Sequence, residues 1–386
     1  MKVFNDNGKC CGCGLCTTVC KKNAIVMKSD NKGFIYPEID EKLCIECGMC
    51  MKICSYNSEE IFNKPIECYA ALTKNKEVLS KSASGGIFAT IAYQFIKSGG
   101  WVCGSVMEFK DGIATCHHTV SNKLNDIKKM QGSKYVQSDI TEALFEIKKL
   151  ISQKEKILFC GTPCQVSAVR KLAMDYEELY TIDIICHGVP SVNLYNEFLK
   201  CKTSKNAEIC GFLFRDKSKG KGYKAKISEE KNNKIKERIY PAHLLSYYHY
   251  FLRSLIDREN CYTCKYAKET RCSNMTIGDY WGIQKIFEGK IKMDFDQSWS
   301  CVMVNDKKGK RLLKETESEF NLIRTKLDDI KQGNAQLNRP TQRSKEREEI
   351  LNLFENKGYQ AVEKDFKRKL GLKYYGLLLR NYIYGR

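Results

Sequence analysis

The chain has 386 residues, enough for two or more domains, and its 42% hydrophobic and 29% charged residues are ordinary for a water-soluble protein of net charge +19. No run approaches 18 consecutive apolar residues, which argues against a membrane span, and the first residues, MKVFNDNGKC, lack the apolar core of a signal peptide. We therefore expect a cytoplasmic protein, in which the 21 cysteines stay reduced and their clustering indicates metal rather than disulfides.

Two cysteine runs near the N-terminus share the spacing C-x2-C-x2-C-x3-C: Cys10, Cys13, Cys16 and Cys20, then Cys44, Cys47, Cys50 and Cys54. Three thiolates with two residues between each wrap a loop around three irons of a cubane. In paired sites the fourth cysteine ligates the other cluster. We expect one [4Fe-4S] cluster on Cys10, Cys13, Cys16 and Cys54, and a second on Cys44, Cys47, Cys50 and Cys20. Zinc fits less well, because its sites usually combine two CxxC-like pairs.

Residues 1–60 resemble bacterial two-cluster ferredoxins, which predicts a ferredoxin domain there. Lys21 and Ser55 stand where such proteins usually have proline after the fourth cysteine, which leaves the ligands untouched. Cys11 is interpreted as a spare thiol within the first run. The polar stretch SYNSEEIFNKP, residues 55–65, is interpreted as a linker.

From residue 66 the hydrophobic pattern alternates between strands and helices. We expect helices over 85–99, 140–151, 166–174 and 191–201, the last capped by Ser191, and strands over 100–107, 113–120, 156–160 and 179–186. The succession predicts a central α/β domain with a mixed sheet, so the fold class is a multidomain α+β and α/β protein.

The remaining segments differ from this pattern. The pattern over residues 207–240 predicts antiparallel strands around the turn RDKSKGKG. This turn is either simply exposed, or its Arg215 and Lys217 attract an anionic substrate. Residues 305–386 form a mostly helical C-terminal region. Its tail, GLKYYGLLLRNYIYGR, is interpreted as packing rather than membrane docking.

Two glycine-containing stretches could approach a phosphate. SASGGIF places Ser84, Gly85 and Gly86 at a helix start, where unpaired N–H groups and the helix dipole favour an anion, although a plain helix cap is the simpler reading. QGSKYVQSD supplies Gly132, Ser133, Lys134 and Tyr135, a combination that suits a dinucleotide.

Three further stretches place cysteines at turns. CGTPCQ (160–165) and DIICHGVPS (183–191) each follow a buried strand, at the end of the sheet where ligands gather, and NCYTCKYAKETRC holds the isolated pair Cys261 and Cys264. Cys164 and Cys186 are natural partners for that pair, and Cys272 is the rival fourth ligand. A redox-active pair of Cys160 with Cys164, or buried thiols without a role, are the alternatives.

These motifs in this order resemble the beta subunit family of coenzyme F420 hydrogenase and dehydrogenase, over about residues 66–290. The resemblance implies an FAD held by Ser84, Gly85, Gly86 and the Gly132–Tyr135 stretch, and a third [4Fe-4S] cluster on Cys164, Cys186, Cys261 and Cys264. His187 could donate a proton near the flavin or be an ordinary loop histidine. No residue is assigned as catalytic.

The resulting hypothesis is an iron–sulfur flavoprotein oxidoreductase that joins single-electron clusters to a two-electron substrate, either coenzyme F420 or another metabolite. A redox partner protein is expected, and an anionic small substrate would suit the positive charge. The alternative is an electron-transfer subunit without substrate chemistry of its own. An iron–sulfur nucleic-acid binder has only the charge in its favour, because no recognition motif accompanies it.

Overall fold

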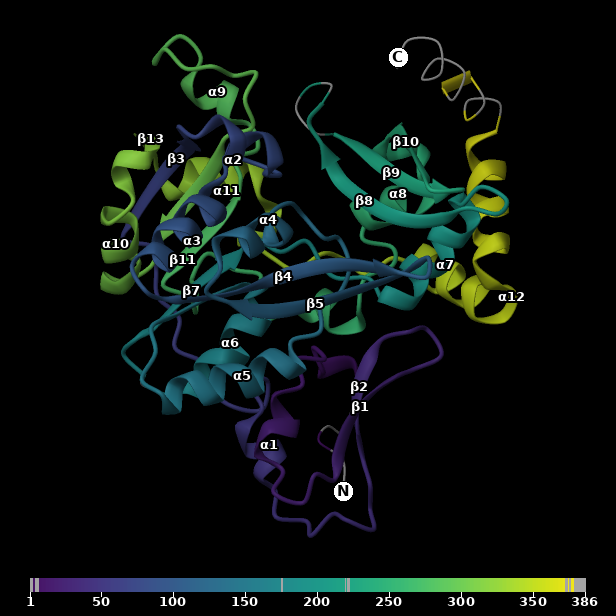
Figure 1. Ribbon diagram of the computed structural model, residues 1–386, viewed down its shortest axis with the longest axis horizontal. Coiled ribbons are helices and arrows are strands. Elements are labelled where there is room, and N and C mark those ends of the chain that lie inside the picture. The colour runs from purple at the N-terminus through teal and green to yellow at the C-terminus, as the bar shows by residue number, and fades with distance from the viewer. Residues whose placement is uncertain are drawn as a thin grey trace.

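The computed structural model describes residues 3, 7–174, 176–218, 220, 223–371, 374 and 376–377. Three regions are visible in Figure 1: an N-terminal unit below, a twisted sheet with helices on both faces, and a lobe built around a smaller sheet. In the part of the chain that is described, no helix is both long and apolar enough to cross a membrane.

The N-terminal unit contains two short helical turns and a hairpin. Strands β1 (Ile25–Ser29) and β2 (Ile35–Ile39) pair antiparallel, and the helical turns are η2 (Leu15–Val19) and α1 (Met49–Ile53). The Asp30 carboxylate fixes the hairpin turn by accepting hydrogen bonds from the backbone N–H groups of Lys32 and Phe34, at 3.0 and 2.8 Å. The two cysteine runs lie on either side of this hairpin in the sequence.

Eight strands of the described chain form one mixed sheet. Their spatial order is β13 (Phe320–Arg324), β3 (Glu67–Thr73), β12 (Ser300–Val304), β11 (Met275–Asp279), β7 (Leu179–Ile184), β6 (Ile157–Gly161), β4 (Trp101–Lys110) and β5 (Ile113–Ser121). The four central strands β11, β7, β6 and β4 are parallel, and the outer strands join them antiparallel. The carboxyl ends of β6, β7 and β11 therefore meet at one edge of the sheet.

Alternate residues of the central strands face two different helix layers. Leu158 packs in a core with α3 (Ile87–Lys97) and α10 (Lys307–Lys314), whereas its neighbour Phe159 packs with α5 (Thr141–Ser152) and α6 (Pro163–Ala173). This follows from the two-residue period of a strand. Smaller helices complete the covering: α2 (Lys76–Lys81), α4 (Ile127–Met130), α9 (Ile283–Phe287) and α11 (Leu327–Gly333).

The second lobe has a core of its own, rich in aromatic side chains. It combines the antiparallel sheet β8 (Glu208–Asp216), β9 (Lys224–Lys231) and β10 (Lys234–Pro241) with α7 (Val192–Lys202), α8 (Ser246–Leu252) and α12 (Lys345–Leu370). Tyr195 and Phe198 of α7 pack against Phe214 of β8 and Tyr247 of α8. Figure 1 shows this lobe beside the main sheet.

The predicted elements between residues 85 and 240 are present, and Ser191 caps α7 by accepting from the Leu194 N–H at 3.2 Å. The mixed α/β fold class is confirmed. One difference concerns the C-terminal region expected to be mostly helical from residue 305, because β13 pairs with β3 at the edge of the main sheet. The expected helical tail over 371–386 lies mostly outside the described residues, although Tyr374 packs on Phe366 with ring centroids 6.1 Å apart.

Candidate functional site

The two N-terminal cysteine runs adopt the same local structure. Gly14 and Gly48 precede η2 and α1 with almost identical dihedral angles, φ 72° and ψ −1° against φ 73° and ψ 0°. Such left-handed conformations favour glycine. The last cysteine of each run, Cys20 or Cys54, follows its helical turn in an extended conformation. The sequence repeat is thus also a structural repeat.

Contacts between the runs agree with crossed cluster ligation. Burial, with a smaller effect of the neighbouring Cys13 and Cys10 thiols, raises the pKa of Cys54 to about 11. Cys54 belongs to the second run but lies beside the first. Cys20, of the first run, packs against a core that contains Cys50 of the second run together with Cys16 of its own run. The assignment of Cys54 and Cys20 to opposite clusters remains a prediction that this arrangement supports.

Cys164, Cys186, Cys261 and Cys264 line one cavity. Cys164 is in the first turn of α6, Cys186 follows β7, and the other two come from the segment around η5 (Glu259–Thr263). Cys272 does not line this cavity and instead lies near the Pro163 carbonyl oxygen, with its sulfur 3.5 Å away. The structure brings together the four expected ligands from three separated loops.

Several side chains that could bind a metal group line this cavity. Within the described ranges, no group of three or more Cys, His, Asp or Glu side chains is close enough to hold one metal ion. The four expected ligands surround the cavity together with a fifth thiol, that of Cys11, and a cubane takes four thiolates spread around it rather than at one point. His187 also lines the cavity, but its Nε2 lies 2.8 Å from the Ser254 hydroxyl and its Nδ1 3.1 Å from Gln336 Nε2. Because both ring nitrogens of His187 already have hydrogen-bond partners, the thiols are the better candidates for ligands.

Helix α6 positions Cys164 and favours its thiolate. Thr162 and Gln165 form a reciprocal capping box at the helix start, with Pro163 in the first turn. A hydrogen bond with the Cys11 thiol lowers the pKa of Cys164 to about 7, assisted by the Thr162 hydroxyl 3.2 Å from its sulfur. Cys160 faces a different cavity and both thiols are free, so the geometry gives no support to a Cys160–Cys164 redox pair.

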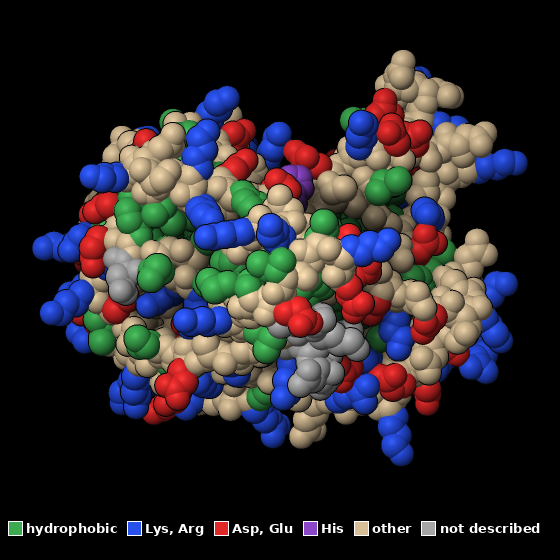
Figure 2. Space-filling model, turned by 90° about the horizontal axis from the view of Figure 1, so that it is seen from below, with side chains coloured by type: hydrophobic (Ala, Val, Ile, Leu, Met, Phe, Trp, Pro, Cys, Tyr) green, Lys and Arg blue, Asp and Glu red, His purple; other side chains and the backbone are tan. Residues whose placement is uncertain are grey.

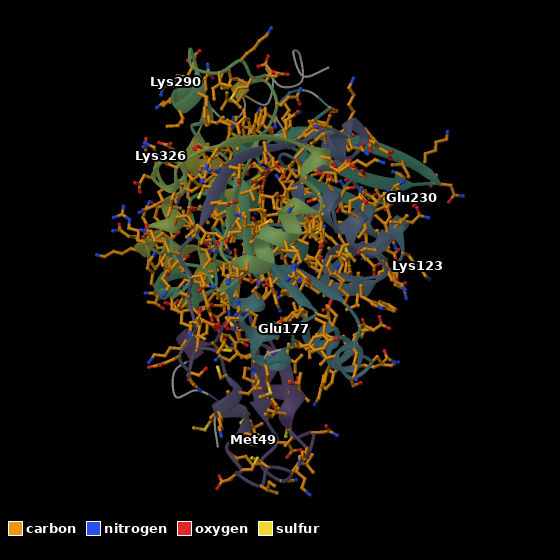
Figure 3. All side chains as sticks on the ribbon, turned by 90° about the vertical axis from the view of Figure 1, so that its left-hand side faces the viewer. Met49, Lys123, Glu177, Glu230, Lys290 and Lys326 are labelled. Atoms are coloured by element: carbon orange, nitrogen blue, oxygen red, sulfur yellow. The ribbon has the colours of Figure 1, made fainter. Side chains whose placement is uncertain are left out.

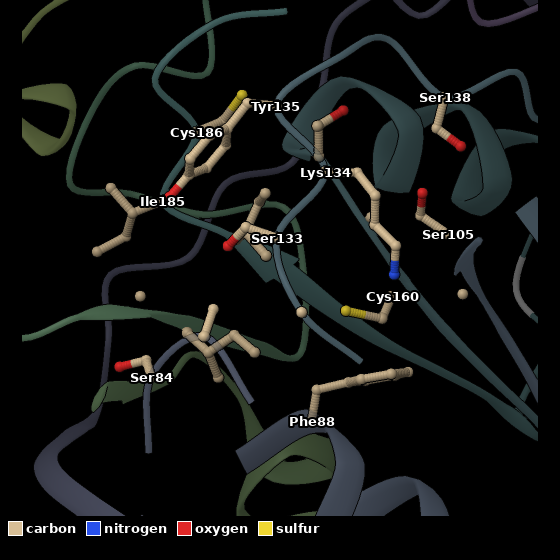
Figure 4. A pocket seen from close by; sticks show the side chains of 18 of the residues that line it. Ser84, Phe88, Ser105, Ser133, Lys134, Tyr135, Ser138, Cys160, Ile185 and Cys186 are labelled. Atoms are coloured by element: carbon tan, nitrogen blue, oxygen red, sulfur yellow. The ribbon is translucent and has the colours of Figure 1, made fainter. Parts of the chain in front are cut away.

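A larger pocket of about 290 Å³ opens at the carboxyl ends of β6, β7 and β11 (Figure 4). This is close to the lower end of the usual range for small-molecule sites, about 300 Å³. Its wall includes six of the seven residues expected to hold the flavin: Ser84, Gly86, Gly132, Ser133, Lys134 and Tyr135. The start of α3 is part of this wall, and no side chain caps it.

Gly85 does not line the pocket. A Cβ on Gly85 would lie 2.4 Å from the Ala71 carbonyl oxygen of β3, and its N–H donates to the Ser300 hydroxyl at 2.9 Å. Glycine is therefore required here by close packing on β3 and β12. Gly86, at φ 81°, has the positive φ of a turn and does face the pocket.

Lys134 and Tyr135 are fixed by contacts of their own. The Lys134 ammonium donates to the carbonyl oxygens of Lys129, Met130 and Gln131 at 2.9–3.0 Å, and burial lowers its pKa to about 8. The Tyr135 ring stacks on Phe251 with centroids 4.5 Å apart. The loop thus presents a cation and a held aromatic ring at the pocket. Arg215, by contrast, is paired with Asp279 at 2.9 Å, so the anion-binding role considered for it has no support.

Two histidines lie in the wall of this pocket: His187, considered from the sequence as a possible proton donor, and His118, interpreted from the sequence as structural. His118 is buried between the Ser138 hydroxyl, 2.8 Å from Nδ1, and the Cys160 carbonyl oxygen, 3.0 Å from Nε2, and stacks on Phe159. His187 lines both this pocket and the cysteine cavity, as do Thr162, Cys186, Gly188 and Val189. The two cavities therefore share a wall. The two-residue alternation in β5 could have indicated that His118 faces inward, because it lies on the same face of the strand as the buried Ala114 and Cys116.

Acid should destabilise the protein through His118. Burial lowers the pKa of His118 to about 3, so below its ordinary pKa of about 6.5 the unfolded chain binds a proton that the folded chain does not. Stability from this group is complete above pH 6.5 and falls as the pH drops, by about 2 kcal/mol between pH 7 and pH 5. Melting temperatures at both pH values test this, since His118→Gln should lose less on acidification. An equal loss in both proteins would contradict it.

The ferredoxin-like unit is fixed on the sheet domain close to both cysteine sets. Arg258, fully buried, donates to the carbonyl oxygens of Cys10 and Ile35 at 2.8 and 2.7 Å and to Gln137 Oε1 at 3.1 Å. Cys11 is buried beside both Cys13 and Cys164, which raises its own pKa well above the ordinary value. From the sequence Cys11 was interpreted as a spare thiol, and its place beside the ligand candidate Cys10 was the one signal that could have indicated a role.

The repeated cysteine unit, packed on an α/β domain with a further cysteine-lined cavity, defines an iron–sulfur electron-transfer protein. Residues 9–58 match a family model described as a 4Fe-4S dicluster domain, and residues 154–329 match one described as the C terminus of the coenzyme F420 hydrogenase/dehydrogenase beta subunit. Over residues 154–329 the chain is thus similar to this beta subunit family, and a match to a 4Fe-4S dicluster domain precedes that region. Both resemblances inferred from the sequence are confirmed.

One solved structure and the curated proteins complete the comparison. A chain of the F420-reducing [NiFe] hydrogenase complex from Methanosarcina barkeri, in a xenon derivative, is similar over 76% of this chain and 95% of that chain, with 17% identity and a TM-score of 0.47. No curated protein matches the chain.

Proposed function

We propose that this protein is an FAD-dependent iron–sulfur oxidoreductase with a third [4Fe-4S] cluster on Cys164, Cys186, Cys261 and Cys264. The observation that carries the proposal is the shared wall: Cys186 and His187 border both the cysteine cavity and the large pocket. This segment would be the wall between a cluster held in one cavity and a flavin held in the other. FAD when bound would exchange single electrons with clusters and a hydride with a substrate.

The residues around the pocket suit a dinucleotide with a flat ring system. The uncapped start of α3, an eleven-residue helix, offers N–H groups to a phosphate, and Gly86 lets the phosphate approach. Tyr135 and Phe88 supply aromatic surface on opposite sides of the pocket (Figure 4). Ser133 lies between them and has room to donate a hydrogen bond. In this proposal these residues bind and orient the flavin, and no residue is assigned as the proton donor.

The substrate is proposed to be an anionic two-electron carrier such as coenzyme F420 or another metabolite, and the protein is expected in the cytoplasm. A second function rests on the description of the matched family as a beta subunit. In that case the chain passes electrons within a larger complex and another subunit performs the chemistry. Substrate reduction by the isolated chain separates the two functions.

Cofactor analysis of anaerobically purified protein tests the proposal. Three cubane clusters and one flavin predict about 12 irons and one FAD per chain. Ser133→Trp places bulk in the middle of the pocket, and we expect the affinity for FAD to fall at least about tenfold, or ~1.4 kcal/mol, with iron unchanged. Ser152→Trp, on the exposed end of α5, is the matched control. Full FAD content in Ser133→Trp, or clusters without flavin in the unmodified protein, would overturn the flavin assignment.

A further inference from the structure

The two halves of the ferredoxin unit present equivalent faces to different surroundings. Each residue of the first run has its counterpart 34 positions later, so that Leu15 corresponds to Met49 and Gly14 to Gly48. Leu15 is 1% exposed, whereas Met49 is 48% exposed. The two halves of the unit therefore present the same face differently: the face around Leu15 is buried (the buried copy), and the equivalent face around Met49 is exposed (the open copy).

The buried copy is an internal docking contact. Leu15 packs in one core with Ile140 and Leu144 at the start of α5, and a Cβ on Gly14 would lie 2.4 Å from the Thr141 hydroxyl oxygen. This contact holds the first cysteine run against the sheet domain, near Cys164. A Cβ on Gly48 would meet no atom of the described chain within 4 Å. The open copy therefore has space for a partner where the first has α5.

Apolar side chains gather on the open copy around the second cysteine run. We call this the distal face: Leu43, Ile45, Met49 and Met51, exposed by 50%, 63%, 48% and 42%. Their counterparts in the first run are Lys9, Cys11, Leu15 and Thr17, so the exposed copy carries more apolar side chains than the buried one. Figure 3 shows Met49 at the far tip of the molecule, and Figure 2, seen from that end, shows apolar side chains near the middle of the face.

From this non-equivalence we infer that the distal face is the docking site for an acidic one-electron carrier protein with an apolar surface over its own redox centre. The first copy of the face joins its cysteine run to the sheet domain by apolar contact, and the second offers the same contact to a separate protein. Cys47 is exposed in the middle of it, so a carrier would reach the second cluster closely. The inference rests on the proposed function and identifies the partner that supplies its electrons.

The chemistry of the face suits a transient, charge-steered complex. Two of its four side chains are methionines, which are flexible and adapt to different partners. Four exposed lysines, Lys21, Lys22, Lys42 and Lys52, lie at or next to the second cluster's sequence segments, and three exposed acidic residues, Asp40, Glu41 and Glu46, nearly balance their charge. The net charge of +19 of the whole chain attracts an acidic protein and speeds its encounter, and the apolar side chains of the distal face then make the contact. One electron leaves the reduced carrier and enters the cluster on Cys44, Cys47, Cys50 and Cys20, with no bond formed and no proton required.

The experiment compares two reductants of the anaerobic full-length protein. Reduced acidic two-cluster ferredoxin is the protein probe, and reduced methyl viologen, too small to need a docking face, is the other. We expect the double variant Ile45→Glu, Met49→Glu to be reduced by ferredoxin at least about tenfold more slowly, because it adds repulsion and removes apolar contact. Iron content and the viologen rate should be retained. Ile61→Glu, a 74% exposed apolar residue in the linker, is the matched control and should not change either rate.

Three results would overturn the inference. They are an unchanged ferredoxin rate in the double variant, a wild-type protein reduced by viologen but not by ferredoxin, and a wild-type dimer that the double variant converts to a monomer. The last would identify a second copy of the chain as the occupant. Failure of the proposed function is separate, since a protein without flavin could still have its clusters reduced by ferredoxin through this face.

Discussion

Cys186→Ser and Cys261→Ser should each remove about four irons per chain while the ferredoxin unit keeps its two clusters. Both thiols line the same cavity as Cys164 and Cys264, and a cubane that loses one of four thiolate ligands is held by three protein ligands only. Electron flow from ferredoxin to the flavin should stop, whereas dyes should still reduce the flavin directly. Iron analysis, the loss of one cluster signal in electron paramagnetic resonance, and parallel ferredoxin and dye assays measure this.

Cys272→Ser is the matched control, because Cys272 is a cysteine from the same segment that lies outside the cavity. It is 1% exposed, and Arg170 donates to its carbonyl oxygen, so its role is packing between α6 and the segment before β11. The variant should keep its iron and its electron flow. If Cys272→Ser lost the cluster while Cys186→Ser retained it, the ligand set would be wrong and Cys186 would be a structural thiol.

The cysteine sites could be predicted because their signals are local. The spacing of the two runs alone indicates two cubanes, and the positions of Cys164 and Cys186 after buried strands indicate one edge of a parallel sheet. The structure adds that β6 and β7 are neighbours in parallel register, which brings these turns together. Cys164 and Cys186 were natural partners for the isolated pair Cys261 and Cys264, but no spacing relates the two pairs, and the choice against Cys272 came from the family resemblance.

Roles set by contacts between distant segments could not be predicted. Gly85 looked like a phosphate-binding glycine, but its environment is fixed by Ala71 and by Ser300, which is 215 residues away in sequence. The strand β13 is short and amphipathic, and it forms at the edge of the main sheet because β3 offers it a partner. Cys11 seemed redundant within its run, and only the docked arrangement places it beside Cys164. In each case a tertiary contact decides what a short motif does.

Arg258 holds the ferredoxin unit in that docked arrangement, and Arg258→Met should loosen it. The guanidinium donates to two carbonyl oxygens of the ferredoxin unit and lies 4.1 Å from the centroid of the Tyr36 ring. Loss of these donors leaves buried acceptors unsatisfied at a cost of at least about 2 kcal/mol, which raises the undocked population about 30-fold. Limited proteolysis in the linker 55–65 should release the ferredoxin unit faster, and flavin reduction by ferredoxin should slow because the clusters move apart.

Arg253→Met is the matched control five residues earlier in the chain. Its guanidinium is half exposed and pairs with Glu346 at 3.1 Å, a kind of surface ion pair worth about 0–1 kcal/mol. It should alter neither proteolysis nor electron transfer. Dye reduction of the clusters should persist in Arg258→Met, because the ligands themselves are untouched. A contrary result would be an Arg258→Met variant that is cleaved no faster than Arg253→Met and passes electrons at the wild-type rate. Smaller contacts, such as the hydrogen bond from Gln137 Nε2 to the Cys11 carbonyl oxygen at 3.3 Å, would then be sufficient to dock the ferredoxin unit, and the buried arginine would have another role.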